Sequence, residues 1–194
     1  MVDESLSGMR VAILATDDFE EAELIEPKKA LDAAGAVTAI ISPKSKKIQG
    51  VRHDEKTVKV GADMLLSEAN ADDFDAVVLP GGALNADALR VVPAAQEFVR
   101  RIDRAGKPIA VICHGPWLLA SAGLVRGRHL TSYHTIQDDL RNAGAQWDDA
   151  EVVRDRNWVS SRQPTDLPAF NREMLSLFAE HHVGAQKHKL RSAA

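Results

Sequence analysis

The sequence predicts an α/β fold in which helices cover both faces of a mostly parallel sheet. Short apolar runs typical of buried strands alternate along the chain with stretches of helical period. Such alternation forms parallel sheets whose functional sites lie at the carboxyl ends of the strands. The 194 residues, 45% of them hydrophobic, suffice for one domain with a sizeable core.

The first half of the chain contains two predicted strands and one predicted helix. Arg10–Thr16 (RVAILAT) is an apolar run that ends at an acidic stretch, and Ala36–Pro43 (AVTAIISP) is a second such run. Between them, Glu21–Ala34 carries apolar residues at helical spacing, and Gly35 is a suitable C-terminal stop. Residues 44–60 are polar with scattered β-formers, so an edge hairpin is expected there.

The same alternation resumes in the second half. Asp75–Gly82 (DAVVLPGG) and Lys107–Cys113 (KPIAVIC) predict two more strands. Ala94–Ala105 is amphipathic and predicts the helix between them, while Pro116–Ala122 (PWLLASA) predicts the helix that leaves the later strand. The last third is expected to hold a helix, a hairpin and a final helix: Thr135–Ala143, residues 150–162 and Asp166–His182.

These elements are expected to form one domain over residues 9–182. Residues 1–8 are expected to be a flexible N-terminus that is too acidic for a secretory signal. Residues 183–194 offer little apolar surface to bury, so a disordered tail is expected there.

Composition argues against several classes of function. The chain has 24 basic and 28 acidic residues, so it lacks the electrostatic footprint of a protein with nucleic acid as a stable partner. No apolar run approaches the ~20 residues that a membrane-spanning helix needs. A single cysteine forms neither an intrachain disulfide nor a multi-cysteine metal site. A cytoplasmic location without membrane contact is therefore expected.

The one cysteine, Cys113, follows an apolar strand in the run VICHGP. It is either a small buried hydrophobe or a nucleophile on a strand-to-helix corner. Gly115 matches the downstream glycine of the nucleophile elbow, but Val111 replaces the upstream one. If the corner forms, the helix from Pro116 is expected to lower the thiol pKa.

Three further features are candidate partners of the thiol. His114 is a candidate general base or acid, although neighbouring side chains on an extended segment point apart. Glu20 follows the first strand, where a solvated surface role is the alternative. Gly81 and Gly82, with the His114 backbone, are candidate donors to an oxyanion, although a glycine pair by itself indicates only a turn.

Several stretches resemble the PfpI-like intracellular protease family, within the class I glutamine amidotransferase-like superfamily that includes the Parkinson-linked deglycase. The resemblance covers about Met9–His182 and includes ATDDFEEAEL, VLPGG, ICHGPWLLASAGLVRGRHLTSY, DDLRNAGAQW and NWVSSRQPTDLPAF. It implies a flavodoxin-like three-layer sandwich with a cysteine nucleophile at the elbow.

The resemblance also implies roles for individual residues. Glu20 is expected to contact the thiol, and His114 is its proposed partner. Asp87 is expected to reach that histidine from a neighbouring subunit, so the complete site would require a homodimer or a higher homo-oligomer. Two departures are the stretch before Asp87, which is about one residue longer than in relatives, and Arg156, which replaces a hairpin glycine.

The resulting hypothesis is a stress-protective enzyme in which the Cys113 thiolate attacks a carbonyl carbon. Glyoxalase or deglycase chemistry on reactive aldehydes, or on their adducts with proteins, is preferred because peptide cleavage also needs a leaving-group acid and an extended groove. The alternatives are an intracellular cysteine peptidase and a redox sensor or chaperone with an oxidisable Cys113. Metal binding through Glu20, Cys113 and a histidine fits no dedicated spacing, so neither a metal nor a cofactor is expected. A glutamine amidotransferase is disfavoured because no synthetase domain accompanies the chain.

Overall fold

A computed structural model describes residues 5–192, with side chains described through Gly184. Seven strands form the central sheet: β1 (Arg10–Leu14), β3 (Val37–Ser42), β6 (Met64–Leu65), β7 (Ala76–Leu79), β8 (Ile109–Ile112), β11 (Val152–Asp155) and β12 (Trp158–Ser161). Five strands form two smaller sheets: β2 (Phe19–Glu20), β4 (Lys47–Arg52) and β5 (Glu55–Gly61) in one, and β9 (His129–Leu130) and β10 (Gln146–Trp147) in the other. The helices are α1 (Glu21–Ala33), α2 (Ala83–Arg90), α3 (Pro93–Arg104), α4 (Pro116–Ser121), α5 (Gln137–Asn142) and α6 (Leu167–Ser192), with short 3₁₀ helices η1 (Ala71–Asp73), η2 (His134–Ile136) and η3 (Pro164–Asp166).

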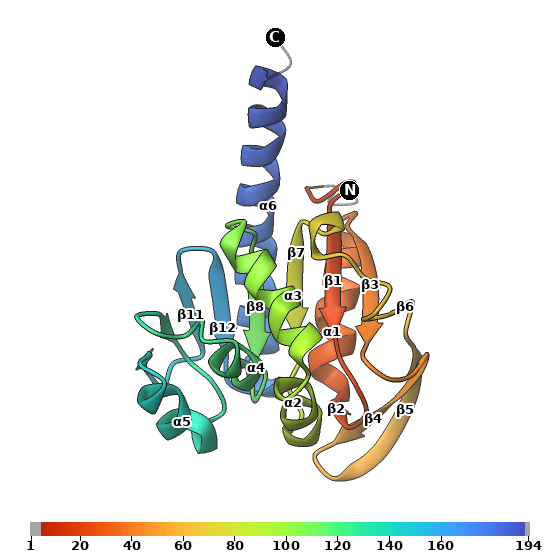
Figure 1. Cartoon of the computed structure of the whole chain (residues 1–194), viewed down its shortest axis with the longest axis vertical. Coiled ribbons are helices and arrows are strands. Elements are labelled where there is room, and N and C mark those ends of the chain that lie inside the picture. The colour runs from red at the N-terminus through yellow and green to blue at the C-terminus, as the bar shows by residue number, and fades with distance from the viewer. Residues whose placement is uncertain (1–4, 193–194) are drawn as a thin grey trace.

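The central sheet has the order β11-β12-β8-β7-β1-β3-β6 (Figure 1). Every neighbouring pair in it is parallel except β11 and β12, which form an antiparallel hairpin. From β1 the chain moves to β3 on one side and then to β7 and β8 on the other. The order therefore reverses between β1 and β7, and such a switch point is where open α/β sheets bind ligands.

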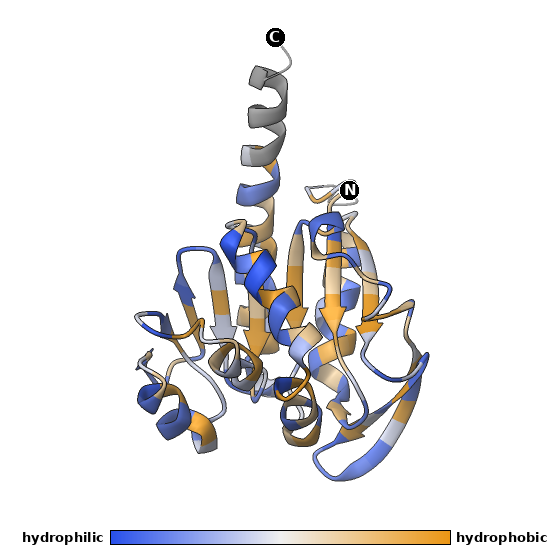
Figure 2. Cartoon of the chain, viewed as in Figure 1, coloured by the Kyte–Doolittle hydropathy of each residue, from blue (hydrophilic) through white to orange (hydrophobic). Residues whose placement is uncertain are grey.

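The sheet is buried on both faces because the side chains of a strand alternate between them. Ala12 and Leu14 of β1 pack into one core with α3 and α4, whereas Val11 and Ile13 pack into the other core with α1 and α6. The apolar strands lie behind a helix α3 that is polar on its outer side (Figure 2). The predicted three-layer, mostly parallel sandwich is confirmed.

The structure differs from the sequence-based expectations at both chain ends and in one loop. Leu6 is fully buried and its N–H bonds to the Ala34 carbonyl, so this part of the N-terminal segment packs on the domain; residues 1–4 lie outside the described residues. Helix α6 continues to Ser192, through most of the predicted tail, because the run after Gly184 is rich in good helix formers; residues 193–194 are not described. Helix α2 was not predicted because it has only eight residues and follows directly on a glycine pair.

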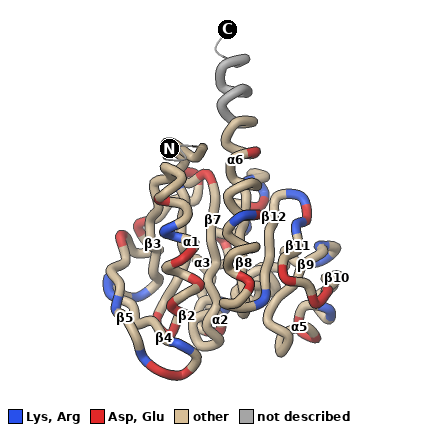
Figure 3. The backbone as a smooth tube through the Cα atoms, turned by 180° about the vertical axis from the view of Figure 1, so that it is seen from behind, with Lys and Arg blue, Asp and Glu red and all other residues tan. Residues whose placement is uncertain are grey.

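Basic and acidic residues are interspersed along the described chain (Figure 3). Among the described residues, no helix combines the length and hydropathy that crossing a membrane requires.

The β11–β12 hairpin turns at Arg156, whose φ of +54° lies in the left-handed region that favours glycine. The sequence resemblance placed Arg156 where relatives have glycine, and the strained backbone agrees with that departure. The Arg156 guanidinium donates to the Gly127 carbonyl at 3.3 Å, which ties the turn to the loop before β9.

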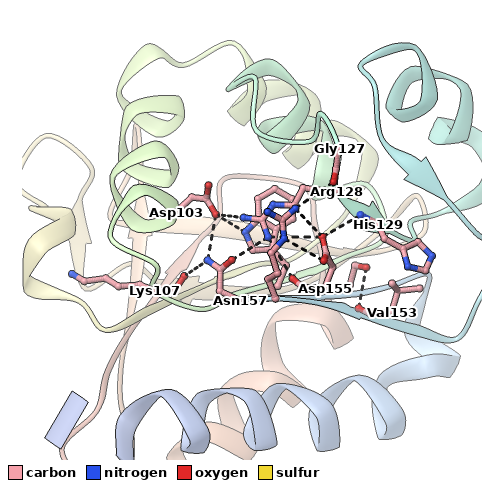
Figure 4. A network of polar contacts seen from close by, with 11 residues as sticks. Asp103, Lys107, Gly127, Arg128, His129, Val153, Asp155 and Asn157 are labelled. Atoms are coloured by element: carbon pink, nitrogen blue, oxygen red, sulfur yellow. Dashed lines mark hydrogen bonds and ion pairs between the residues drawn. The ribbon is translucent and has the colours of Figure 1, made fainter. Parts of the chain in front are cut away.

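A buried arginine joins four segments at the end of the sheet where β8 and β12 begin (Figure 4). Arg128 donates to the Asp103 carboxylate at 2.7 Å and to the Asn157 side chain at 3.0 Å. Its guanidinium stacks 4.2 Å from the Trp158 ring centroid, and Asp155 lies 3.9 Å away. Both carboxylates are largely shielded from water and therefore need a cation: Arg128 pairs with Asp103, and it shares Asp155 with Arg156, whose Nε lies 3.3 Å from that carboxylate.

Arg128→Met is expected to lower the free energy of unfolding by about 3 kcal/mol, since it leaves the largely buried Asp103 carboxylate without its cation. The matched control is Arg154→Met, which removes an arginine from a more exposed pair with Glu180 and should cost less than about 1 kcal/mol. Urea unfolding of the two variants measures the difference. Equal losses would show that the buried network adds nothing beyond a surface ion pair.

Candidate active site

Cys113 lies at a sharp corner directly after β8. Its φ is +61°, a left-handed backbone that a non-glycine residue rarely adopts and that resembles a nucleophile elbow. Gly115 permits the corner, because a Cβ there would lie 2.7 Å from the Leu79 carbonyl oxygen. The corner is held on both sides: Cys113 N–H donates to the Ser161 carbonyl at 3.1 Å, and the Cys113 carbonyl accepts from Tyr133 N–H at 2.9 Å.

Glu23, which was not predicted from the sequence, lies beside the Cys113 thiol: a Cβ on Gly81 would lie 2.4 Å from Glu23 Oε2 and 3.1 Å from the Cys113 sulfur. It comes from the first turn of α1 and is fully buried, and its Oε2 accepts the Gly81 N–H at 2.9 Å. Burial, reinforced by the negative charge of Glu20, raises the pKa of Glu23 to about 8. Its Oε1 has no hydrogen-bond partner among the described residues, which also favours the neutral acid because a buried carboxylate oxygen without a donor is costly. At pH 7 Glu23 is therefore protonated; once it ionises, its carboxylate accepts a hydrogen bond from the thiol, which raises the pKa of Cys113.

Glu20, the predicted thiol contact, is directed elsewhere. Its Oε2 accepts the backbone N–H of His53, at the tip of the β4–β5 hairpin, at 3.0 Å. The physical reason is helical geometry: Glu23, Pro27 and Leu31 are buried at i, i+4 and i+8 on the inner face of α1, whereas Glu20 precedes the helix at the end of β2. The sequence signal that could have identified Glu23 is its position among the apolar residues that line the buried face of this helix.

The glycine pair brings the backbone close to the sulfur. A Cβ at Gly81 would lie 2.4 Å from the Glu23 carboxyl and 2.5 Å from the Cys113 Cβ, so no side chain fits. The Gly81 N–H is already donated to Glu23 and is therefore not available to an oxyanion. The backbone N–H groups of Gly82 and His114 face Cys113 and counteract part of the rise in its pKa.

His114 lies against the sulfur despite following it directly in sequence. Its Nδ1 is 3.2 Å from Sγ, because the left-handed corner turns the two side chains toward one another. The ring lies between Trp117 and Tyr133, with centroid separations of 5.3 and 5.0 Å. Burial, and secondarily the charge of His134, lowers the pKa of His114, so the ring is neutral and able to accept a proton at pH 7.

The expected lowering of the thiol pKa was wrong. Burial, followed by the negative charge of an ionised Glu23, raises the pKa of Cys113, and the helix that leaves the corner has only six residues. The resting group at pH 7 is therefore a thiol, flanked by a protonated carboxyl and a neutral imidazole.

Asn85 was also missed by the sequence-based prediction. It is fully buried in α2, where its Oδ1 accepts the Thr16 N–H at 2.8 Å and its Nδ2 donates to the carbonyl oxygens of Pro80 and Gly81. It thus fixes the turn after β7 to the end of β1. An asparagine close after a glycine pair was the only available signal.

Asp87 lies on α2, exposed to solvent, and does not line the pocket at Cys113 in the described chain. Leu84 and Val91, on this helix and at its end, are exposed apolar side chains with 66% and 70% of their surface accessible. Within one chain the structure therefore does not bring Asp87 to His114.

The thiol faces a pocket of about 590 Å³, although only 7% of the Cys113 surface is exposed. The pocket is lined by residues from the ends of the central strands, the β4–β5 hairpin tip and the segment before α6: Glu20, Ala22, Glu23, Arg52, His53, Asp54, Gly82, Ala83, Cys113, His114, Tyr133, Gln163, Pro164 and Thr165. Among the residues that the structure describes, no three His, Cys, Asp or Glu side chains are grouped to hold a metal ion.

The strained Cys113 corner, with a carboxyl and an imidazole beside the sulfur, is a feature shared with known families of cysteine proteins. The model of the DJ-1/PfpI family matches residues 9–177. The chain belongs to this family. It is 47% identical over 169 residues to a deglycase of Pyrococcus abyssi, a match that covers 87% of this chain and 99% of the relative. It is 44% identical over 169 residues to the "Putative cysteine protease YraA" of Bacillus subtilis, covering 87% of this chain and 97% of the relative.

Solved structures show the same fold. The DJ-1beta structure of Drosophila melanogaster matches with a TM-score of 0.81 and 28% identity, covering 94% of this chain and 98% of the other. The family membership and the flavodoxin-like fold implied by the sequence resemblance are both confirmed.

Proposed function

We propose that this DJ-1/PfpI family protein is a cysteine-dependent enzyme that acts on small reactive aldehydes or their adducts, in the manner of a glyoxalase or deglycase. One observation carries the proposal: beside a pocket, the Cys113 sulfur lies 3.2 Å from a neutral base, His114, and close to a buried acid, Glu23. The deglycase name of the Pyrococcus abyssi relative supports the same substrate class.

The reaction begins with transfer of the thiol proton from Sγ to His114 Nδ1 as sulfur attacks the carbonyl carbon. A new C–S bond forms, and the carbonyl π electrons move to oxygen, where the N–H groups of Gly82 and His114 would stabilise the negative charge. Protonation of this oxygen, by Glu23 or by the imidazolium, gives a hemithioacetal.

For a 2-oxoaldehyde the later steps are proton transfers and a hydrolysis. The ionised Glu23 or the neutral His114 removes the proton from the carbon bonded to sulfur, and the neighbouring carbonyl oxygen gains a proton, which gives an enediol. The hydroxyl on the sulfur-bearing carbon then loses its proton while the neighbouring carbon gains one, and a 2-hydroxy thioester results. Water then adds to the thioester, the C–S bond breaks, and the 2-hydroxy acid leaves with the thiol restored. Atoms and electrons balance without an external oxidant.

Peptide cleavage is the alternative that the YraA name supports. Its thioester intermediate would form only after His114 protonates an amine leaving group. The two functions are separated by incubating the reduced chain with methylglyoxal and, in parallel, with a fluorogenic peptide. Aldehyde loss with formation of lactate supports the proposal. Peptide hydrolysis without aldehyde loss, or no turnover of either, contradicts it; an oxidised Cys113 without turnover would favour the redox sensor.

We also propose that the chain forms a homo-oligomer in which Asp87 of one subunit approaches the site of a neighbour. Its place on α2 beside exposed Leu84 and Val91 supports this, because exposed apolar side chains around a charged residue are common in interfaces. The helix also contacts α4, which directly follows the Cys113 corner.

Asp87→Ala is expected to lower turnover about tenfold or more without unfolding the chain, since the residue is exposed. Size-exclusion chromatography with light scattering should give a mass well above the 21.1 kDa of one chain. Asp72→Ala, at an exposed aspartate before β7, at the opposite end of that strand from α2, is the control that should keep full activity. A fully active monomer would exclude a site shared between subunits.

A further inference from the structure

The tip of the β4–β5 hairpin forms one wall of the Cys113 pocket. Residues 52–54 make up this tip, and they line the pocket together with Cys113 and His114. The hairpin extends past the carboxyl end of the central sheet (Figure 1). Strand β4 pairs with β2 as far as Val51, and residues 52–54 beyond this pair are exposed. The shape of the pocket therefore depends on what holds the tip.

The backbone of the tip is strained at His53. Its φ is +60°, in the left-handed region that a residue with a side chain adopts only where its surroundings hold it there. The group that holds it is the Glu20 carboxylate, whose Oε2 accepts the His53 N–H at 3.0 Å. A hydrogen bond to a charged acceptor is stronger than one between neutral groups, so this contact is suited to keep a strained turn in place.

Glu20 is itself firmly placed beside the Cys113 corner. Only 8% of its surface is exposed, and its backbone N–H donates to the Gly81 carbonyl at 3.3 Å. The preceding residue, Phe19, is fully buried and packs on Gly50 so closely that a Cβ there would lie 2.9 Å from the ring. A carboxylate fixed at the turn after β7 thus reaches the exposed tip of a separate hairpin.

We propose that Glu20 is a positioning residue that acts through the hairpin tip: by accepting the His53 N–H it holds the tip as a wall of the pocket and so limits the size of the molecules that reach Cys113. The wall leaves room for small carbonyl compounds and restricts bulky ones. The consequence for substrates rests on the proposed function, whereas the effect on access to the sulfur does not.

The hydrogen bond of Glu20 can be separated from its charge, which also acts on Glu23. Glu20→Gln removes the charge and keeps an oxygen acceptor, although a weaker one. Glu20→Ala removes both, and Glu20→Leu removes both while filling the space. An effect of alanine and leucine that glutamine lacks is therefore due to the hydrogen bond. Glu21→Ala, at the next carboxylate along the chain, which does not line this pocket, is the matched control.

The first test needs no substrate, because Cys113 is the only cysteine and a maleimide therefore labels this thiol alone. Rate constants are measured with N-ethylmaleimide and with the bulky fluorescein-5-maleimide. Their ratio cancels changes in the reactivity of the sulfur, since both reagents carry the same reactive group. The bulky-to-small ratio is expected to rise about three- to tenfold over the parent in Glu20→Ala and Glu20→Leu, and to stay within about twofold in Glu20→Gln and Glu21→Ala.

A second test uses methylglyoxal and compares Glu20→Ala with Glu20→Gln. The KM of the alanine variant should be about three- to tenfold higher, because the pocket has lost a wall, while kcat should agree within about twofold. Cys113, His114 and Glu23 are unchanged in both variants, so a role of Glu20 in the chemical step would appear in kcat instead.

These outcomes separate the role of Glu20 from the proposed function. A parent without aldehyde turnover, together with a raised maleimide ratio in Glu20→Ala, would overturn the proposed function and leave the role of Glu20 standing. An active parent whose maleimide ratio is unchanged in Glu20→Ala and Glu20→Leu would overturn the role of Glu20 alone. An equal rise in Glu20→Gln would also overturn it, because charge rather than the hydrogen bond would then be responsible.

Discussion

Cys113→Ser is expected to lower the rate of methylglyoxal consumption by about 10³-fold or more, with the fold intact. Serine has nearly the same shape, so it fits the strained corner and keeps the contacts of the backbone with Ser161 and Tyr133. Its hydroxyl is a far weaker acid than a thiol, and a single nearby imidazole activates it poorly in a site built around sulfur. The measurement is the initial rate of aldehyde loss and lactate formation.

Two controls make this result interpretable. The thermal unfolding midpoint of the serine variant should stay within a few degrees of the parent, and Asp72→Ala, at an exposed aspartate that does not line the pocket, should retain full activity in the same assay. Aldehyde loss that continues in Cys113→Ser at a rate near that of the parent would show that another group carries the reaction. The cysteine mechanism would then have to be abandoned.

Glu23→Gln is expected to lower kcat by about 10²-fold or more, because glutamine can donate a hydrogen bond to sulfur but cannot exchange a proton with the intermediate. The same substitution should change how stability depends on pH. The pKa of Glu23 is raised from 4.5 to about 8 in the fold, so the folded chain holds this proton more tightly than the unfolded chain. The stabilisation is fully present below about pH 4.5 and is lost as pH rises toward 8.

Between these limits, the parent should therefore lose up to about 1.4 kcal/mol of unfolding free energy per pH unit relative to Glu23→Gln. Urea unfolding at several pH values measures this slope. Glu20→Gln is the matched control, because it makes the same chemical change three residues earlier. It should leave most of the pH dependence of the unfolding free energy in place, and its main effect should be on the hydrogen bond that Glu20 accepts from His53 at the β4–β5 hairpin tip. Parallel pH curves for the parent and Glu23→Gln would show that Glu23 is ionised in the fold.

The sequence predicted the framework of this site because its strands and corner depend on local pattern. Three apolar runs placed Cys113, the glycine pair and the acidic segment at strand ends, and parallel topology brings such ends together. His114 followed from adjacency once the corner was assumed. These features need only the period of the strands and the turn chemistry of glycine.

Features that depend on three-dimensional packing were not predicted. Choosing Glu23 over Glu20 requires knowing which face of α1 is buried, and two carboxylates three residues apart look alike in sequence. Asn85 acts by bonding backbone groups after the ends of two different strands. The pKa of Cys113 was assigned the wrong direction because burial, invisible in the sequence, exceeds the influence of a short helix.

The pH profile of Cys113 alkylation in the folded chain tests the central claim, that Glu23 and His114 together control this sulfur, most directly. The rate should level off near pH 8, where Glu23 ionises beside the sulfur, instead of rising further as for free cysteine. Glu23→Gln should remove the plateau, and His114→Ala should slow labelling about tenfold at pH 7. A parent profile that follows free cysteine and is unchanged in both variants, or labelling that occurs only after denaturation, would contradict the account.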